Sequence, residues 1–263
     1  MLFDTHCHLD ASEFDPDRPA VVAAARNAGV DRILVPAVAV ANFAAVRACC
    51  AHYAGCLPAY GIHPLYVESS SDDDLAILRR HLGREMEGEL PASAVGEIGL
   101  DFFAPGANVD RQAYFLREQL RIAADLDLPV VLHVRRAIDA VLGQLRATPV
   151  CGGIAHAFNG SREQAEHFIK RGFCLGFGGA MTYPGSTRIR RLAATLPIES
   201  IVLETDAPDI APAWLDRDNG CARNTPGELF RIAEVLAELR GVAVANIIEV
   251  TARNARRCLR MTE

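Results

Sequence analysis

The sequence lacks the features that would assign it to several large classes of protein. No apolar run approaches the ~18 residues that a membrane span needs, and no low-complexity tract or linker divides the chain. Asp4 and His6 interrupt the apolar start at once, so we do not expect a secretory leader. We therefore expect one domain over residues 1–263 that acts in the cytoplasm and has no membrane attachment.

Paired cysteine motifs are also missing. None of the eight cysteines forms a C-x-x-C pair, and 263 residues can build a core without a disulfide framework. Most of them lie in apolar stretches, as Cys174 does before Leu175, which is typical of small buried hydrophobic residues. We therefore expect reduced thiols.

The chain has no excess of positive charge. It carries 27 Lys and Arg against 33 Asp and Glu, which gives a net charge of −6. Proteins that coat nucleic acid non-specifically are usually basic. If the substrate is a nucleic acid, it would therefore have to meet a local positive rim and be held at an end or over a short stretch. No pattern in the chain indicates an obligate protein partner.

Short apolar, β-branched runs alternate with longer amphipathic stretches along the whole chain. The expected strands cover residues 2–4, 32–36, 57–61, 94–97, 130–133, 153–156, 174–178 and 201–204. The expected helices cover residues 18–28, 42–53, 72–87, 111–125, 136–146, 161–171, 186–196, 226–239 and 243–259. This alternation predicts an α/β fold, a single-domain (β/α)8 TIM barrel. A doubly wound open sheet is the alternative, but its Gly-rich first turn is replaced here by His-Cys-His-Leu-Asp.

Histidines and carboxylates gather where the expected strands end. His6 and His8 follow the first strand, and alternation along a strand points both the same way and Cys7 the opposite way. In a barrel the strand ends open onto the C-terminal face, where barrel enzymes keep their active sites. We therefore interpret the set as a metal site. The other candidates at strand ends are His63, Glu97, His133, His156 and Asp206.

The number of candidate ligands favours two divalent ions over one, because a catalytic ion takes roughly three or four ligands from the protein. Glu97 lies in the middle of the strand order and is the natural bridge, and a water between two cations loses its proton readily. Asp206 is predicted to bind one ion and to take the proton from the attacking water. The predicted ligands are His6, His8, Glu97, His133, His156 and Asp206, with His63 in reserve.

Four segments together resemble the TatD family of metal-dependent hydrolases, in the same order and at similar spacing over residues 2–258. Residues 178–184 are similar to the YjjV-type branch of that family. Val134 and Asn159 depart from the family pattern beside two ligands, which bears on substrate preference because both lie at the mouth of the site. The four segments are His6-Cys7-His8 after Asp4, Gly61-Ile62-His63-Pro64, Val95-Gly96-Glu97-Ile98-Gly99-Leu100-Asp101 and Glu204-Thr205-Asp206-Ala207-Pro208.

The resemblance implies a metal-dependent deoxyribonuclease with an amidohydrolase-like barrel, which trims single-stranded or frayed DNA from the 3′ end. It implies two ions, Mg²⁺, Mn²⁺ or Zn²⁺, with a hydroxide between them that attacks phosphorus. It places His63 close to the metals, in contact with substrate phosphate or a water. It assigns His6, His8, Glu97 and Asp206 to one ion and Glu97, His133 and His156 to the other.

Three further residues are candidate substrate contacts. Arg135 follows His133 at the active face and could clamp a phosphate, or pair with a neighbouring acid. Asn159 precedes a helix start that could bind an anion, although a plain N-cap is the alternative. Asn224 ends a long loop over residues 207–224 that is a candidate substrate rim or lid. We interpret Trp214 in that loop as a hydrophobic plug rather than a base-stacking residue.

Two alternatives to a deoxyribonuclease stay open. The same two-metal machinery could hydrolyse another ester or amide, such as that of a D-aminoacyl-tRNA. A non-catalytic metal-binding scaffold is the other alternative, and the complete ligand set speaks against it.

Overall fold

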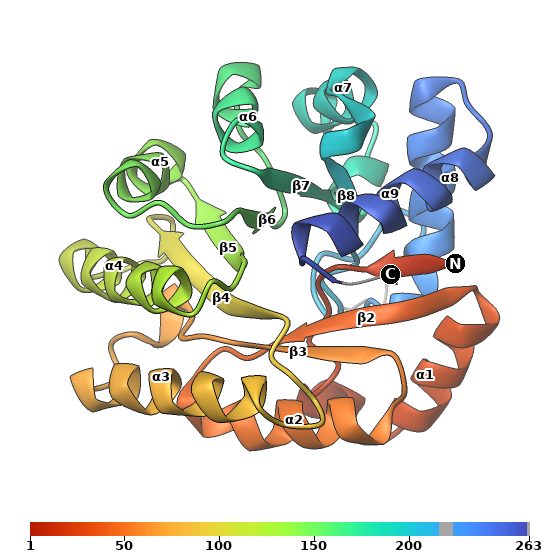
Figure 1. Cartoon of the computed structure of the whole chain (residues 1–263). Coiled ribbons are helices and arrows are strands. Elements are labelled where there is room, and N and C mark those ends of the chain that lie inside the picture. Colours follow the sequence, from red (N-terminus) through yellow and green to blue (C-terminus); the bar gives the residue numbers. More distant parts are fainter. Residues whose placement is uncertain (216–222, 262–263) are drawn as a thin grey trace.

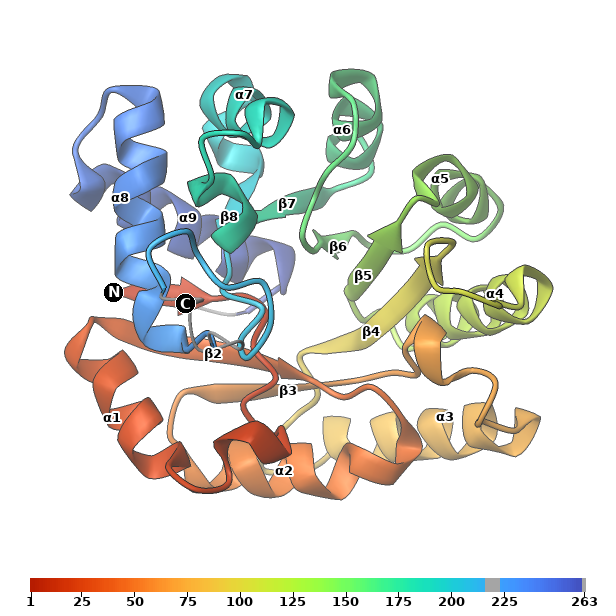
Figure 2. The ribbon, with the colours of Figure 1, turned by 180° about the vertical axis from the view of Figure 1, so that it is seen from behind.

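Eight parallel strands form the centre of the molecule, hydrogen-bonded in the order β1 to β8. The computed structural model describes residues 1–215 and 223–261. Figure 1 shows the strands as a ring with helices around it, and Figure 2 shows the ring from behind. The strands are β1 (Leu2–Asp4), β2 (Val30–Pro36), β3 (Cys56–Tyr60), β4 (Ala94–Asp101), β5 (Val130–Arg135), β6 (Gly153–Ala155), β7 (Phe173–Phe177) and β8 (Ile201–Leu203).

Amphipathic helices pack around the ring. In α3, for example, Leu75, Leu78 and Leu82 recur at helical spacing and are buried. None of the helices in the described ranges is long and apolar enough to cross a membrane. The helices are α1 (Arg18–Asn27), α2 (Phe43–His52), α3 (Asp72–Met86), α4 (Val109–Asp125), α5 (Ile138–Ala147), α6 (Arg162–Ile169), α7 (Thr187–Thr195), α8 (Leu229–Arg240) and α9 (Val244–Cys258).

The ring of strands closes between β8 and the segment that follows β1. The Thr5 amide donates to the Leu203 carbonyl at 3.0 Å, and the Asp206 amide donates to the His6 carbonyl at 2.8 Å. Cys7 and Ala207 add an isolated parallel bridge. The prediction of a (β/α)8 barrel is therefore confirmed. The same bonds bring the H-x-H segment alongside Asp206.

The inside of the barrel is built in layers. One apolar residue from every strand contributes to an inner layer, and side-chain alternation puts the next inward position two residues further along each strand. Two residues after the floor residue, the chain has His133 in β5, His156 just after β6 and Glu204 just after β8. Polar side chains therefore lie directly above an apolar floor. The floor residues are Phe3, Leu34, Ala59, Ala94, Val131, Ile154, Cys174 and Val202.

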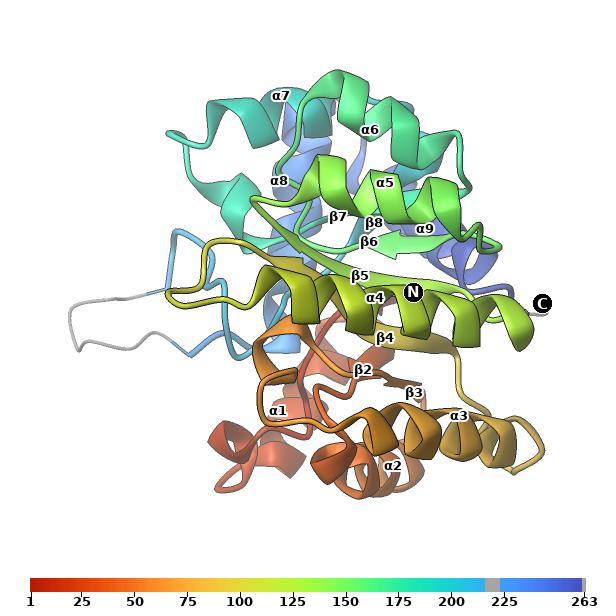
Figure 3. The same ribbon diagram turned by 90° about the vertical axis from the view of Figure 1, so that its left-hand side faces the viewer.

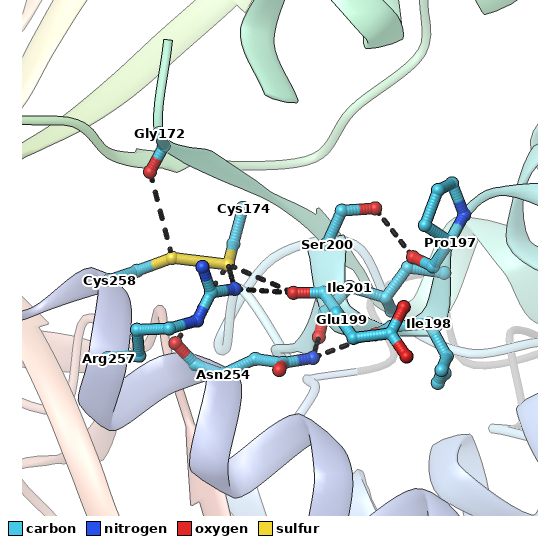
Figure 4. The surroundings of a disulfide bond; sticks show 10 residues. All are labelled: Gly172, Cys174, Pro197, Ile198, Glu199, Ser200, Ile201, Asn254, Arg257 and Cys258. Atoms are coloured by element: carbon cyan, nitrogen blue, oxygen red, sulfur yellow. Dashed lines mark hydrogen bonds between the residues drawn. A yellow bond between two sulfur atoms is a disulfide. The ribbon is translucent and has the colours of Figure 1, made fainter. Parts of the chain in front are cut away.

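Helix α9 covers the end of the barrel that lies below the apolar floor, away from these polar side chains. Ala252, Ala255, Cys258 and Leu259 pack on the inner layer, and Figure 3 shows α9 and both termini at this end. The Cys258 thiol forms a disulfide with Cys174 of β7, 84 residues away in the sequence (Figure 4). The helix therefore plugs this end and leaves the other end for the site.

The disulfide corrects the expectation of reduced thiols. Cys174 lies inside the barrel and Cys258 at the end of the last helix, so only the closed fold brings them together. Among the other described cysteines the thiols are free, as expected, and Cys221 lies outside the described residues. The free cysteines are Cys7, Cys49, Cys50, Cys56 and Cys151.

The predicted elements occur with shifted ends. β4 continues past Glu97 because Asp101 still pairs with Arg135 of β5. β6 and β8 end one residue before His156 and Glu204, so these side chains leave the sheet at the rim of the barrel. The helix expected at 226–239 begins as a 3-10 turn, η6 (Pro226–Glu228), and continues as α8.

Candidate metal centre

The H-x-H segment presents both imidazoles to one point inside the barrel mouth. The Nε2 atoms of His6 and His8 lie 3.3 Å apart. His6 is fully buried, while His8 reaches the cleft above it. Cys7 points away into the hydrophobic core, where burial raises the pKa of its thiol well above the ordinary value. The alternation predicted for this segment therefore persists beyond the last residue of β1.

Glu97 lies between two groups of histidines and turns one carboxylate oxygen to each. Its Oε2 lies 3.2 Å from His6 Nε2 and 3.6 Å from His8 Nε2. Its Oε1 lies 2.8 Å from His133 Nδ1 and 3.5 Å from His156 Nε2. The side chain is only 2% exposed. One buried carboxylate thus contacts both histidine pairs that sequence analysis assigned to separate ions.

The first group has the spacing of a metal coordination shell. Besides the His6, His8 and Glu97 contacts, Asp206 Oδ1 lies 3.6 Å from His6 Nε2 and 3.9 Å from His8 Nε2. A tetrahedral shell with bonds of about 2.1 Å separates neighbouring ligand atoms by roughly 3.4 Å. The donors are imidazole nitrogens and carboxylate oxygens, which suit Zn²⁺ or Mn²⁺. His6, His8 and Glu97 therefore bring their ligand atoms close enough together to hold one divalent ion. Asp206 forms an overlapping group with His6 and His156, whose ligand atoms also lie within 4.8 Å of one another.

The second group contains Glu97, His133, His156 and also His63. His63 Nε2 lies 3.6 Å from Glu97 Oε1. However, His63 Nδ1 accepts the Leu65 amide at 3.2 Å, so in the neutral ring the proton is on Nε2. A protonated Nε2 donates a hydrogen bond and cannot ligate a metal. His63 is therefore better suited to contact an oxygen of substrate or water than to replace His133 or His156 as a ligand.

Short distances couple the charges in this cluster. Burial lowers the pKa of His6 to about 3, and the His156 ring stacked at 3.8 Å adds to the effect. Burial also opposes the charged form of His156, but Asp206, Glu204 and Glu97 outweigh it and raise its pKa to about 10. Burial disfavours ionised Glu97 too, yet the surrounding histidines hold its pKa well below the usual value. A buried carboxylate that stays ionised in contact with several imidazole nitrogens is an environment that favours a bound cation.

Glu204 supports the second group, and sequence analysis assigned it no role. Its Oε1 lies 3.4 Å from His156 Nδ1 and accepts the Ala157 amide at 2.6 Å. A carboxylate on the far nitrogen of a ligand histidine fixes the ring's orientation and tautomer. Gly176 leaves room for it, because a Cβ there would lie 2.1 Å from Glu204 Oε2. The position of Glu204, two residues before Asp206, was the available sequence signal.

A cleft of about 1540 Å³ opens above the cluster. Arg135 and Asn159 line it, as the candidate substrate contacts require. The guanidinium of Arg135 lies over the Phe103 ring at 3.9 Å. Asn159 Oδ1 accepts two hydrogen bonds from Arg188, at 3.1 and 2.7 Å, so this asparagine holds a second arginine in the cleft. Neither Phe103 nor Arg188 was identified from the sequence.

The structure does not bring Asn224 to the cleft. Asn224 is fully buried, and its Nδ2 donates to the carbonyls of Thr205 and Asp209 at 2.7 and 3.0 Å. Its amide therefore holds the start of the loop in place rather than facing substrate. Trp214 packs against the core and donates to Glu228 at 2.7 Å, as expected of a plug. The proposed lid over 207–224 lies partly outside the described residues.

The fold is that of the metal-dependent hydrolase barrels. The model of the family described as TatD related DNase matches residues 3–260. The uncharacterized metal-dependent hydrolase YjjV of Escherichia coli (strain K12) is 40% identical over 256 residues, 96% of this chain and 95% of that one. The crystal structure of YjjV, a TatD homolog from E. coli K12, aligns with a TM-score of 0.92 at 38% identity, over 99% and 98% of the chains. The 3′-5′ ssDNA/RNA exonuclease TatD of Cronobacter sakazakii is 33% identical over 259 residues, 97% of each chain.

The chain therefore belongs to the TatD family, and it is a metal-dependent hydrolase. The family resemblance read from the sequence is confirmed, including the similarity to YjjV.

Proposed function

We propose that this protein is a nuclease that removes nucleotides from the 3′ end of single-stranded or frayed DNA, with two divalent ions at the barrel mouth. The observation that carries the proposal is Glu97, whose one oxygen faces His6 and His8 and whose other oxygen faces His133 and His156, all within 3.6 Å. Paired ions are suited to phosphodiester hydrolysis because they neutralise charge on both the attacking and the leaving oxygen. The proposed ligands are His6, His8 and Asp206 on one side of Glu97, and His133 and His156 on the other.

The side chains around the proposed ions have separate tasks. Asp206 is placed to accept a proton from the attacking water, because its carboxylate lies beside His6 and His8 at the mouth of the barrel. His63 donates from Nε2 to a phosphate oxygen, because its Nδ1 is occupied by the Leu65 amide. Arg135 at the rim of the cleft contributes positive charge toward the substrate backbone.

Two features support DNA ends as the substrate class. The centre is deeply buried, with His6 at 0% and His156 at 5% exposure, so a continuous duplex would not reach it without fraying. Arg135, Arg136 and Arg188 line the cleft and offer donors to a phosphate backbone, beside acidic side chains such as Asp10 and Asp139. The name of the Cronobacter sakazakii relative, 3′-5′ ssDNA/RNA exonuclease TatD, agrees with a single strand and with this polarity. Such substrates are available in the cytoplasm, where we propose that the protein acts.

The test is a side-by-side assay of 3′-labelled single-stranded DNA and a D-aminoacyl-tRNA, each with Mg²⁺, Mn²⁺ or Zn²⁺. We expect metal-dependent loss of the 3′ label in the wild type. Glu97→Gln should abolish it while circular dichroism stays unchanged, and the exposed Glu249→Gln should serve as a fully active control. Clear deacylation with no DNA trimming under any metal would refute the nuclease and favour an ester hydrolase.

A further inference from the structure

We infer that Phe103, Arg135 and Arg136 form a second phosphate subsite, which binds the backbone phosphate next to the scissile one. This inference rests on the proposed nuclease function and adds a binding site to it. All three residues line the cleft, beside the strand ends of β4 and β5. The guanidinium groups of Arg135 and Arg136 lie 3.9 and 4.4 Å from the centre of the Phe103 ring.

Within the part of the chain that the structure describes, neither guanidinium group has an acidic partner. Some arginines elsewhere pair with carboxylates, such as Arg79 with Asp125 at 2.6 Å and Arg223 with Asp17 at 2.6 Å. Within residues 1–215 and 223–261, the side chains of Arg135 and Arg136 make neither a salt bridge nor a hydrogen bond, only their contacts with Phe103. An aromatic ring holds a cation without neutralising it. The N–H donors therefore stay available for an anion that bridges the two groups.

The backbone is arranged to bring the two arginines together. Neighbouring residues on a strand point to opposite sides, so Arg135 and Arg136 would normally diverge. Arg136 instead has a φ of +56°, a left-handed conformation that is uncommon for a residue with a long side chain. This conformation directs both guanidinium groups to the same ring. Strained backbone of this kind concentrates at ligand-binding sites.

Phe103 is exposed, yet its backbone is held in place. The residue is 44% exposed, and its backbone amide donates to Asp101 Oδ1 at 2.8 Å. The other oxygen of Asp101 lies 3.2 Å from His133 Nε2. One buried carboxylate therefore ties the aromatic support to a proposed metal ligand and fixes the distance between the two sites.

The position along the strand favours the neighbouring phosphate over the scissile one. His133 and Arg135 are on the same face of β5, and two residues of strand advance about 6.6 Å. His133 contacts Glu97 in the buried centre, whereas Arg135 is exposed at the mouth. A phosphate at the arginines therefore lies outside the ions. Phe103 acts as a positioning residue, and the arginines contact the phosphate.

The test compares two thymidine dinucleotides, dTpdT and its 5′-phosphorylated form pdTpdT, which differ only by one phosphate. We expect the wild type to prefer pdTpdT by about 10-fold in kcat/KM, the size of one charge-assisted contact at a partly exposed site. Arg135→Ala, Arg136→Ala and Phe103→Leu should each remove most of that preference, and Phe103→Tyr should retain it. Arg79→Ala, which breaks an ion pair outside the cleft, is the matched control.

Binding gives a second readout that does not depend on turnover. For chelator-treated protein and a short single strand, the slope of log K against log salt should become shallower by about 0.7 for each lost phosphate contact. We expect this change in Arg135→Ala and Phe103→Leu, but not in Phe103→Tyr or Arg79→Ala. Hydrolysis of both dinucleotides with an unchanged preference in all variants would overturn the subsite alone. Hydrolysis of neither by the wild type would overturn the nuclease proposal and the subsite with it.

Discussion

The Cys174–Cys258 disulfide is predicted to contribute a large share of the stability of the fold. It closes a loop with a sequence separation of 84 residues. In the chain-entropy description, a crosslink over a loop of this length stabilises the folded state by about 4.5 kcal/mol. Domains typically unfold at a cost of only 5–15 kcal/mol, so reduction should be readily visible.

The reduced protein should nevertheless stay folded in the absence of denaturant. α9 keeps other bonds to the barrel, since Asn254 donates to the carbonyls of Ile198 and Ile201 at 2.7 and 2.8 Å (Figure 4). Its apolar face also stays packed on the inner layer. We therefore expect a lower unfolding midpoint and faster amide exchange in the last turn of α9, with an unchanged far-UV circular dichroism spectrum.

The assay is guanidinium unfolding of oxidised and phosphine-reduced protein, with peptide mapping to confirm the pairing. A Cys174→Ala/Cys258→Ala double variant should match the reduced wild type and ignore reductant. Cys151→Ser, which alters an exposed free thiol, should behave as the wild type does. Equal midpoints for oxidised and reduced wild type, or an unreduced sample in which Cys174 is free, would refute the reasoning.

Two further predictions concern groups at and away from the centre. Glu204→Gln should weaken binding of one ion by about 10- to 100-fold, because the partner of His156 Nδ1 loses its charge; isothermal titration would show this, and unchanged affinity for both ions would count against it. Burial lowers the pKa of His81 below its ordinary value of 6.5, so the unfolded chain binds the proton more readily and stability falls as pH drops below 6.5. His81→Phe should therefore lose less stability than the wild type between pH 7.5 and 5.5 in denaturant titrations, and parallel losses would show that this histidine is not responsible.

Local patterns were sufficient to predict the barrel and to place the candidate ligands at one end of it. Strand and helix periods are short-range properties, and parallel strands in a barrel place their C-terminal ends at one face. His133 and His156 could thus be related to His6 without knowing any distance. The central position of Glu97 could be predicted from the strand order, and its two oxygens contact His6 and His133 on different strands.

Features that depend on contacts between distant segments could not be predicted. The disulfide joins an inward-facing strand residue to the last helix, and nothing in the local sequence of Cys174 marks it. Asn224 is a polar residue at the end of a long loop, a place where substrate contacts are common. The fold instead buries it against the start of that loop. In the sequence, Phe103 is not distinguished from other apolar residues. Its contact with the arginine pair becomes visible only in the structure, where the backbone turns at Arg136 and brings that guanidinium over the ring.

The central claim, that Glu97 joins two ions, is tested most directly by counting metal. Protein purified without chelator and then saturated with Mn²⁺ or Zn²⁺ should contain two ions per chain by elemental analysis and titration calorimetry. Glu97→Gln should fail to bind two ions, because the substitution removes the negative charge of the carboxylate that contacts both groups of histidines. A wild type that saturates with a single ion, or a Glu97→Gln variant that still binds two with unchanged affinity, would contradict the account.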